Sequence, residues 1–175
     1  MNGCSPSRQR RAFTLVEIII VVIILGIVSG IVIISTMPTE TTSAVAAADI
    51  IARDLELARQ EANGRQEALV VEFSVSSNSY SIKDTDGNVI SHPVKQTTAS
   101  ININDEVTTG TITLVSADFG DSGQSIYFSA LGEPVASDLT TPISSDSKVV
   151  VQCGDETYSV IVAPVTGRVR VQAGG

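Results

Sequence analysis

Few side chains in this 175-residue sequence are of the types that perform covalent or metal chemistry. His92 is the one histidine, and it stands beside Pro93 in a polar stretch, where an exposed loop position is the simplest interpretation. Cys4 and Cys153 have neither the spacing of a metal site nor that of a disulfide framework, and Cys153 is expected to be a small buried side chain in a β-rich run. No motif that activates a nucleophile is present. We therefore predict that the protein is not an enzyme and has no catalytic residues, cofactor or metal.

The run Asp-Thr-Asp-Gly-Asn at residues 84–88 begins like a calcium-binding loop. Such a loop needs a bidentate glutamate at its twelfth position, where this sequence has Lys95. Asp86-Gly87 is also a common turn sequence between two strands. We therefore interpret residues 84–88 as a hairpin turn.

Arg168 and Arg170 are candidates for binding chemistry. On a strand, residues two apart share one face and lie about 7 Å apart, a spacing that suits adjacent phosphates. The overall charge opposes this interpretation, because 11 basic residues stand against 19 acidic ones and the net charge is −8. A chain this acidic repels polyanions such as DNA. The alternative is that both arginines pair with nearby acidic side chains.

The elements that must position these residues begin with an apolar segment. Hydrophobic residues make up 43% of the chain and charged residues 17%, and residues 18–34 contain no charge at all. Residues 13–34 form about 33 Å of helix, which is enough to span a bilayer core. Arg8, Arg10 and Arg11 precede the segment, and the excess of positive charge would hold the N-terminus in the cytoplasm.

An ordinary secretory signal is the competing interpretation of this segment. Such a signal has an apolar core of only about 7–15 residues, followed at once by a small-residue cleavage site. The nearest candidate, Ala-Val-Ala at residues 44–46, lies some ten residues beyond the apolar run and inside a helix-favouring stretch. The sequence therefore favours a retained membrane helix.

Glu17 lies near the start of this apolar helix, where a carboxylate is costly and usually has a partner. If the chain is cut between Ala12 and Phe13, Glu17 becomes the fifth residue, and the new amino group of Phe13 can pair with the Glu17 of a neighbouring subunit. In a bundle of low dielectric constant this pairing would neutralise the acid and fix the stagger between helices. Alternatively, Glu17 lies at the headgroup level and is stabilised by the helix N-terminus.

Residues 11–17, Arg-Ala-Phe-Thr-Leu-Val-Glu, together with the apolar run resemble the class III signal of type IV pilins and type II secretion pseudopilins. The resemblance implies cleavage by prepilin peptidase between Ala12 and Phe13, N-methylation of Phe13, and assembly through Glu17. Ala12 is a departure, because the family usually has glycine before the cut.

A second helix is predicted after Pro38, which breaks or kinks the first. Apolar residues spaced by three and four form a stripe that we expect to pack under a sheet, and Gly64 is expected to end the helix. The stripe consists of Ala44, Ala48, Ile51, Leu55, Ala58 and Ala62. The polar residues largely off the stripe are Asp49, Arg53, Asp54, Glu56, Arg59, Gln60 and Glu61.

From Glu67 onward, short alternating runs predict strands separated by turns. The predicted strands are 68–75, 79–83, 89–90, 100–104, 111–115, 125–129, 148–152, 158–163 and 168–172. Their regular spacing indicates antiparallel pairing in two sheets. The predicted fold class is therefore α+β, with a long N-terminal helix, membrane-spanning in its first half, packed on an antiparallel β-sheet domain.

Three further segments resemble the H-type minor pseudopilins, the GspH/FimT family. They are Leu-Ala-Arg-Gln-Glu-Ala at 57–62, Ile-Tyr-Phe-Ser-Ala-Leu-Gly at 126–132 and Thr-Gly-Arg-Val-Arg-Val at 166–171. With the N-terminal signal, the resemblance covers nearly the whole chain. It implies a prepilin leader at 1–12, a transmembrane helix at 13–36, the periplasmic half of the helix at 37–65 and a β-rich globular domain at 66–175.

The function that this resemblance implies is that of a minor pseudopilin, a structural subunit of a type II secretion pseudopilus used in protein export. Its partners would be other pseudopilins or pilins in the filament and the prepilin peptidase. It would cross the bacterial inner membrane once, with its globular domain in the periplasm, before joining the filament. The alternative is a type IV minor pilin of the FimT type, which would bind DNA for uptake through Arg168 and Arg170, since FimT-type pilins carry a similar Gly-Arg-x-Arg near the C-terminus.

Overall fold

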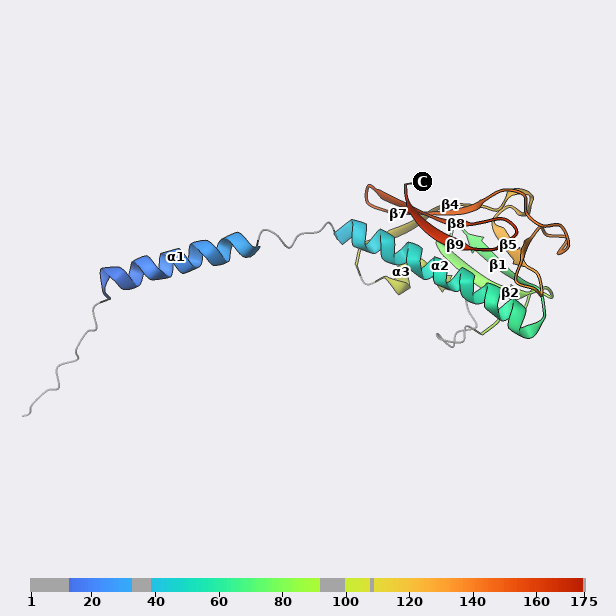
Figure 1. Cartoon of the computed structure of the whole chain (residues 1–175), viewed down its shortest axis with the longest axis horizontal. Coiled ribbons are helices and arrows are strands. Elements are labelled where there is room, and N and C mark those ends of the chain that lie inside the picture. Colours follow the sequence, from blue (N-terminus) through green and yellow to red (C-terminus); the bar gives the residue numbers. More distant parts are fainter. Residues whose placement is uncertain (1–12, 33–38, 92–99, 108, 175) are drawn as a thin grey trace, which may run out of the picture. The chain divides into compact units, whose positions relative to one another are not determined.

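The computed structural model describes residues 13–32, 39–91, 100–107 and 109–174 (Figure 1). The chain divides into two compact units, residues 1–37 and 38–175, and each is described by itself. Ala12, Cys4, Pro38 and His92 lie outside the described residues, so the predictions made for them are not tested by the structure.

The first unit contains helix α1 (Leu15–Val32). It begins after Thr14, whose side-chain oxygen accepts a hydrogen bond from the backbone N–H of Glu17 at 3.2 Å, as an N-capping residue does. Within the described parts of the chain, no helix combines the length and the apolar character needed to cross a membrane. The expected transmembrane helix at 13–36 is therefore not confirmed and stays a prediction.

The second unit contains two antiparallel sheets, which confirms the predicted fold class. One sheet has the order β3-β2-β1-β5-β6 and the other the order β4-β7-β8-β9 (Figure 1). The first sheet consists of β1 (Leu69–Ser74), β2 (Ser79–Asp84), β3 (Ile101–Asn102), β5 (Ser125–Phe128) and β6 (Pro134–Val135). The second consists of β4 (Ile112–Asp118), β7 (Ser147–Cys153), β8 (Glu156–Val162) and β9 (Val169–Ala173). Short helices, α3 (Ile103–Glu106) and the 3-10 turn η2 (Gly120–Ser122), connect strands.

Most predicted strands agree with the structure to within a few residues. The strand predicted at 89–90 is wrong, because Val89 forms only an isolated bridge with Lys83. Two further differences have local causes. The strand predicted at 100–104 ends at Asn102, because the Asn102 side chain accepts a hydrogen bond from the backbone N–H of Asn104 at 3.0 Å and caps α3. Strand β6 was not predicted, because it is only two residues long and begins with proline.

Helix α2 (Thr39–Arg65) carries the predicted apolar stripe, and the structure confirms that stripe. All six of its side chains are at most 1% exposed. They pack against β1 of the first sheet and against β7, β8 and β9 of the second, so α2 joins the two sheets (Figure 1). This contact places the polar face of α2 at the surface beside β9.

The predicted end of α2 at Gly64 is wrong, because the helix continues to Arg65. Gln66 has a φ of 57° and its N–H donates to the Asn63 carbonyl at 3.2 Å, while the Glu67 N–H donates to the Ala62 carbonyl at 3.2 Å. These two bonds form a Schellman motif with glutamine in the left-handed position where glycine is usual. Gly64, which the sequence indicated as the end of the helix, therefore lies two residues before Gln66, the residue with the left-handed backbone.

The hydrophobic core of the second unit is continuous from the α2 stripe into both sheets. Phe73 lies at its centre, with ring centroids 5.5 Å from those of Tyr80 and Phe119. Cys153 is 2% exposed, which confirms its predicted burial, and burial is the main cause that raises the pKa of its thiol. Because every core residue belongs to residues 44–171, this unit has its own core and is expected to fold by itself.

Candidate functional site

The surface of α1 is the first candidate site. Every large apolar side chain from Phe13 to Ile27 is exposed, by 48–75%, and these side chains occur on all sides of the helix. Covering a dozen such side chains is worth on the order of 20 kcal/mol, at about 1.5–3 kcal/mol for each. An apolar surface of this size marks a site that contacts a membrane or other apolar helices.

Glu17 lies in the first turn of α1, at the third helical position after the capping residue Thr14. The sequence Thr-x-x-Glu at the start of a helix is that of a capping box, and a carboxylate there faces the positive end of the helix dipole. Residues 13–32 include no basic side chain, so an ionic partner for Glu17 must come from elsewhere. The proposed roles of Ala12, Phe13 and Glu17 in cleavage and assembly stay predictions.

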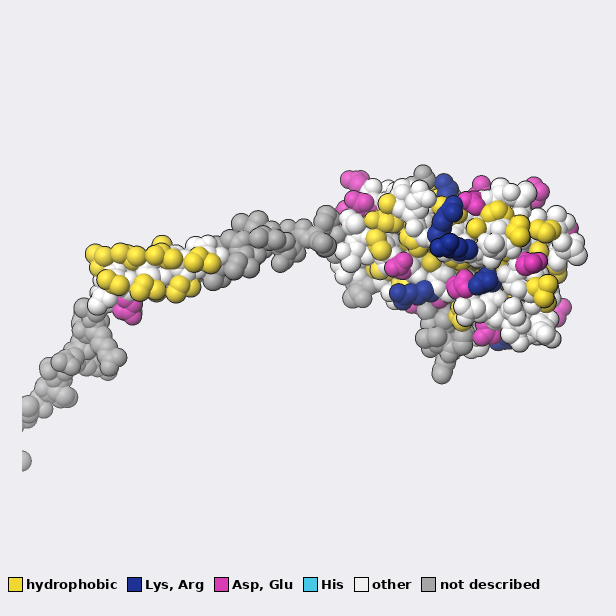
Figure 2. Space-filling view, in the orientation of Figure 1, with side chains coloured by type: hydrophobic (Ala, Val, Ile, Leu, Met, Phe, Trp, Pro, Cys, Tyr) yellow, Lys and Arg dark blue, Asp and Glu magenta, His cyan; other side chains and the backbone are white. Residues whose placement is uncertain are grey.

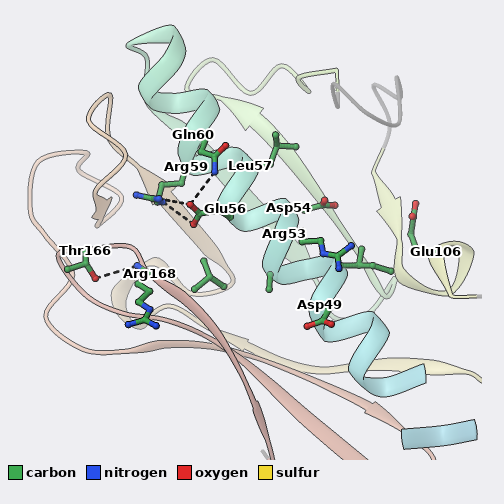
Figure 3. Close-up of a pocket in the computed structure, with 13 residues that line it drawn as sticks. Asp49, Arg53, Asp54, Glu56, Leu57, Arg59, Gln60, Glu106, Thr166 and Arg168 are labelled. Atoms are coloured by element: carbon green, nitrogen blue, oxygen red, sulfur yellow. Dashed lines mark hydrogen bonds and ion pairs between the residues drawn. The ribbon is translucent and has the colours of Figure 1, made fainter. Parts of the chain in front are cut away.

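A second candidate site is an open groove of about 960 Å³ in the second unit, between α2, α3 and the start of β9 (Figure 3). Basic and acidic side chains alternate on this face of α2 and β9 (Figure 2). The charged residues that line the groove are Asp49, Arg53, Asp54, Glu56, Arg59, Glu106 and Arg168. The sequence placed the α2 members off the apolar stripe but gave no indication that Arg168 lies opposite them.

Two of the carboxylates in the groove accept hydrogen bonds from neighbouring side chains. Glu56 accepts from the Nε of Arg59 at 3.1 Å, and this hydrogen bond is the main cause that lowers the pKa of Glu56 (Figure 3). Asp54 is only 6% exposed and accepts from the Tyr80 hydroxyl at 2.5 Å. The sequence placed Asp54 off the stripe, but it lies three residues after the buried Ile51 and faces the core. Burial, followed by the charge of Asp54, raises the pKa of Tyr80 well above its usual range.

Arg168 and Arg170 lie in different surroundings. Arg168 precedes β9, lines the groove and makes no ion pair within the part of the chain that the structure describes. Arg170 lies on β9 and pairs with Asp146 at 2.6 Å, both side chains being about half exposed. The alternative that these arginines pair with nearby acidic side chains is therefore confirmed for Arg170. Exposed pairs of this kind contribute little to stability.

The Asp84 turn is built as the hairpin interpretation predicts. The Asp84 carboxylate accepts from the backbone N–H of Asp86 at 3.0 Å and from the backbone N–H of Asn88 at 2.8 Å. The Asn88 side chain donates to it as well, and these bonds lower the pKa of Asp84. Among the described residues, no group of three or more His, Cys, Asp or Glu side chains could hold a metal ion.

The three internal segments that carry the H-type resemblance meet around Arg59, at the end of the groove. Gly132 of the second segment and Gly167 of the third have φ values of 77° and 63°. A Cβ on Gly132 would lie 3.1 Å from the Arg59 carbonyl, and a Cβ on Gly167 would lie 3.0 Å from Arg59 Cδ and 3.2 Å from Pro134 Cδ. Both glycines therefore combine a left-handed backbone with a close approach. The three segments are therefore in close contact with one another.

Comparison with known proteins agrees with these observations. The family described as "Prokaryotic N-terminal methylation motif" matches residues 7–33. No curated protein matches the sequence significantly. Among solved structures, the chain is similar to the minor pseudopilin EpsH from the type 2 secretion system of Vibrio cholerae, with a TM-score of 0.53 and 17% identity over 76% of this chain and 98% of that one. It is also similar to the Pseudomonas aeruginosa type IV minor pilin FimU, with a TM-score of 0.49 and 15% identity over 77% of this chain and 90% of that one.

The likeness to EpsH shows the fold. This chain therefore combines an N-terminal methylation motif with a pilin-like fold in which a helix packs on two antiparallel sheets.

Proposed function

We propose that this chain is a minor pseudopilin, a non-enzymatic structural subunit of the pseudopilus of a type II secretion system. Residues 13–36 anchor it in the bacterial inner membrane, with the globular unit in the periplasm. The methylation motif at 7–33 and the EpsH-like fold support a pilin-like subunit. The resemblance of three internal segments to the H-type minor pseudopilins is the ground for choosing secretion.

The observation that carries this proposal is the exposed apolar surface of α1, with Glu17 at its N-terminal end. A membrane covers such a surface before assembly, and a bundle of identical helices covers it in a filament. Cleavage by prepilin peptidase between Ala12 and Phe13 exposes an amino group, which is then N-methylated. The Phe13 amine of one subunit and the Glu17 carboxylate of the next form the ion pair that sets the stagger.

Glu17→Gln tests this assembly role, because it removes the charge and keeps the size of the side chain. The variant should be inserted and cleaved like the wild type but should be depleted several-fold from sheared filaments. The control is Glu67→Gln, which removes an exposed carboxylate just after α2 and should be incorporated normally. Wild-type incorporation of the Glu17→Gln subunit would contradict the proposal.

Capture of DNA through Arg168 and Arg170 has less support. Arg170 is paired with Asp146, so only Arg168 of the two is without an ion pair among the described residues. Two arginines also supply few phosphate contacts against a net charge of −8.

A further inference from the structure

Strand β9 forms one edge of the second sheet, and the direction of its backbone groups follows from the bonds at its two ends. The Arg168 carbonyl accepts from the Ala163 N–H at 2.9 Å, and the Gly174 N–H donates to the Thr157 carbonyl at 2.8 Å. Backbone groups alternate in direction along an antiparallel pair. Residues 168, 170, 172 and 174 therefore face β8, and those between them face away from the sheet.

The residues that face away are Val169, Val171 and Ala173, and each offers one N–H and one C=O. No hydrogen bond within the described residues takes up these groups. Val169 also lines the groove, so open space lies beside the beginning of this edge. Unpaired groups in a row are a template for the addition of another strand.

The opposite edge strand of the same sheet, β4, is closed by side chains at its beginning, over Ile112 and Leu114. The Asn78 side chain donates to the Ile112 carbonyl of β4 and accepts from the Leu114 N–H, and the Asn104 side chain accepts from the Ile112 N–H at 2.7 Å. These two amides occupy the outward groups of β4 as a neighbouring strand would. The edge strands of the first sheet, β3 and β6, are only two residues long. Within the described residues, β9 is thus the long edge strand with no side-chain amide bonded to its outward backbone groups.

The charges beside this edge indicate what it accepts. Arg53 and Arg168 line the groove without an ion pair in the described regions, and Arg170 is held only by an exposed pair with Asp146. A second copy of β9, paired antiparallel to the first, would add its own two arginines on the same face, and like charges across strands are unfavourable. An acidic strand would instead bring carboxylates to these guanidinium groups.

We propose that β9 is a docking edge for an extended acidic segment of a neighbouring filament subunit, which adds to the second sheet as a fifth strand. Backbone bonds to Val169, Val171 and Ala173 hold the segment, and one of its carboxylates pairs with Arg168, which has no ion pair within the described residues. Only the identity of the partner as a neighbouring subunit rests on the proposed function. The chemistry of the edge is independent of that function.

The test uses the globular unit in solution and two synthetic seven-residue peptides, one alternating valine with glutamate and one alternating valine with lysine. NMR of the ¹⁵N-labelled unit should show saturable shifts and slower amide exchange at residues 169, 171 and 173 with the acidic peptide alone. No response at these amides up to about 2 mM acidic peptide, or an equal response to the lysine peptide, would overturn the proposal. Slower exchange of the same amides at higher protein concentration, without peptide, would contradict an acidic partner. It would indicate that a second copy of the chain binds this edge.

A matched pair of variants tests the backbone contact. Ala173→Pro removes one outward N–H and no bond to β8, and should weaken peptide binding about threefold to tenfold. Ala173→Val keeps the N–H and should bind like the wild type. Equal binding by the two variants would overturn strand addition. This assay needs no filament. A failure of the peptide to bind therefore contradicts strand addition alone, whereas normal assembly of the Glu17→Gln subunit contradicts the proposed function alone.

Discussion

Gly167→Ala is expected to destabilise the globular unit strongly, because two costs add at this position. The left-handed backbone, with a φ of 63°, costs about 1–2 kcal/mol for a residue with a Cβ. The new Cβ would also lie 3.0 Å from Arg59 Cδ, 3.2 Å from Pro134 Cδ and 3.3 Å from the Gly132 carbonyl oxygen, and overpacking of this kind costs about 1–3 kcal/mol. The sum of about 2–5 kcal/mol corresponds to a fall in Tm of roughly 8–20 °C, at about 4 °C for each kcal/mol.

Gly120→Ala is the matched control. Gly120 also has a φ of 63°, but no atom lies within 4 Å of its Cβ position, so only the backbone cost of about 1–2 kcal/mol applies. The assay is thermal unfolding of residues 38–175 followed by circular dichroism. Arg59→Ala in the Gly167→Ala background should recover part of the loss, with a coupling of about 0.5 kcal/mol or more. Equal destabilisation by the two glycine substitutions, with no coupling to Arg59, would refute the packing of the three H-type segments.

Two other predictions concern the groove and β9. The globular unit should give no electrophoretic shift with DNA at low salt, whereas a shift that Arg168→Gln with Arg170→Gln abolishes would restore the phosphate-clamp hypothesis. Tyr80→Phe should lower the free energy of unfolding by about 1.5–3 kcal/mol in chemical denaturation, because Asp54 stays buried and loses a donor at 2.5 Å. Since the pKa of Tyr80 is raised by folding, the unfolded chain ionises first, and wild-type stability should fall above about pH 10 by more than that of Tyr80→Phe.

The sequence predicted those helices and strands whose residue pattern lies within the element itself. All six predicted residues of the α2 stripe are buried, because spacings of three and four report one helix face directly, whereas Ser43 and Ala47, which are also buried, were not predicted. Most strands were predicted from alternation within their own residues. The end of α2 was missed because its left-handed residue is Gln66, which carries no glycine signal. Asp54 was misjudged because its hydrogen-bond partner, Tyr80, is 26 residues away.

The candidate site depended on contacts that no local pattern contains. The sequence contained both Arg168 and the polar face of α2, but only the sheet order places them on one groove. The closure of β4 by Asn78 and Asn104, and the lack of such closure at β9, likewise depend on which strands lie at the edges. Resemblance identified the segments at 57–62, 126–132 and 166–171, and the structure shows that they are in close contact.

The central claim is that this chain is processed and assembled as a pilin-like subunit, and the most direct test is the mass of the mature protein. The chain should be purified with its filament from sheared material, and its intact mass and N-terminal peptide should be measured. The account predicts a chain that begins at Phe13 with a methylated amino group. A chain that retains residues 1–12, or one that begins at Ala47 after ordinary signal cleavage, would contradict it.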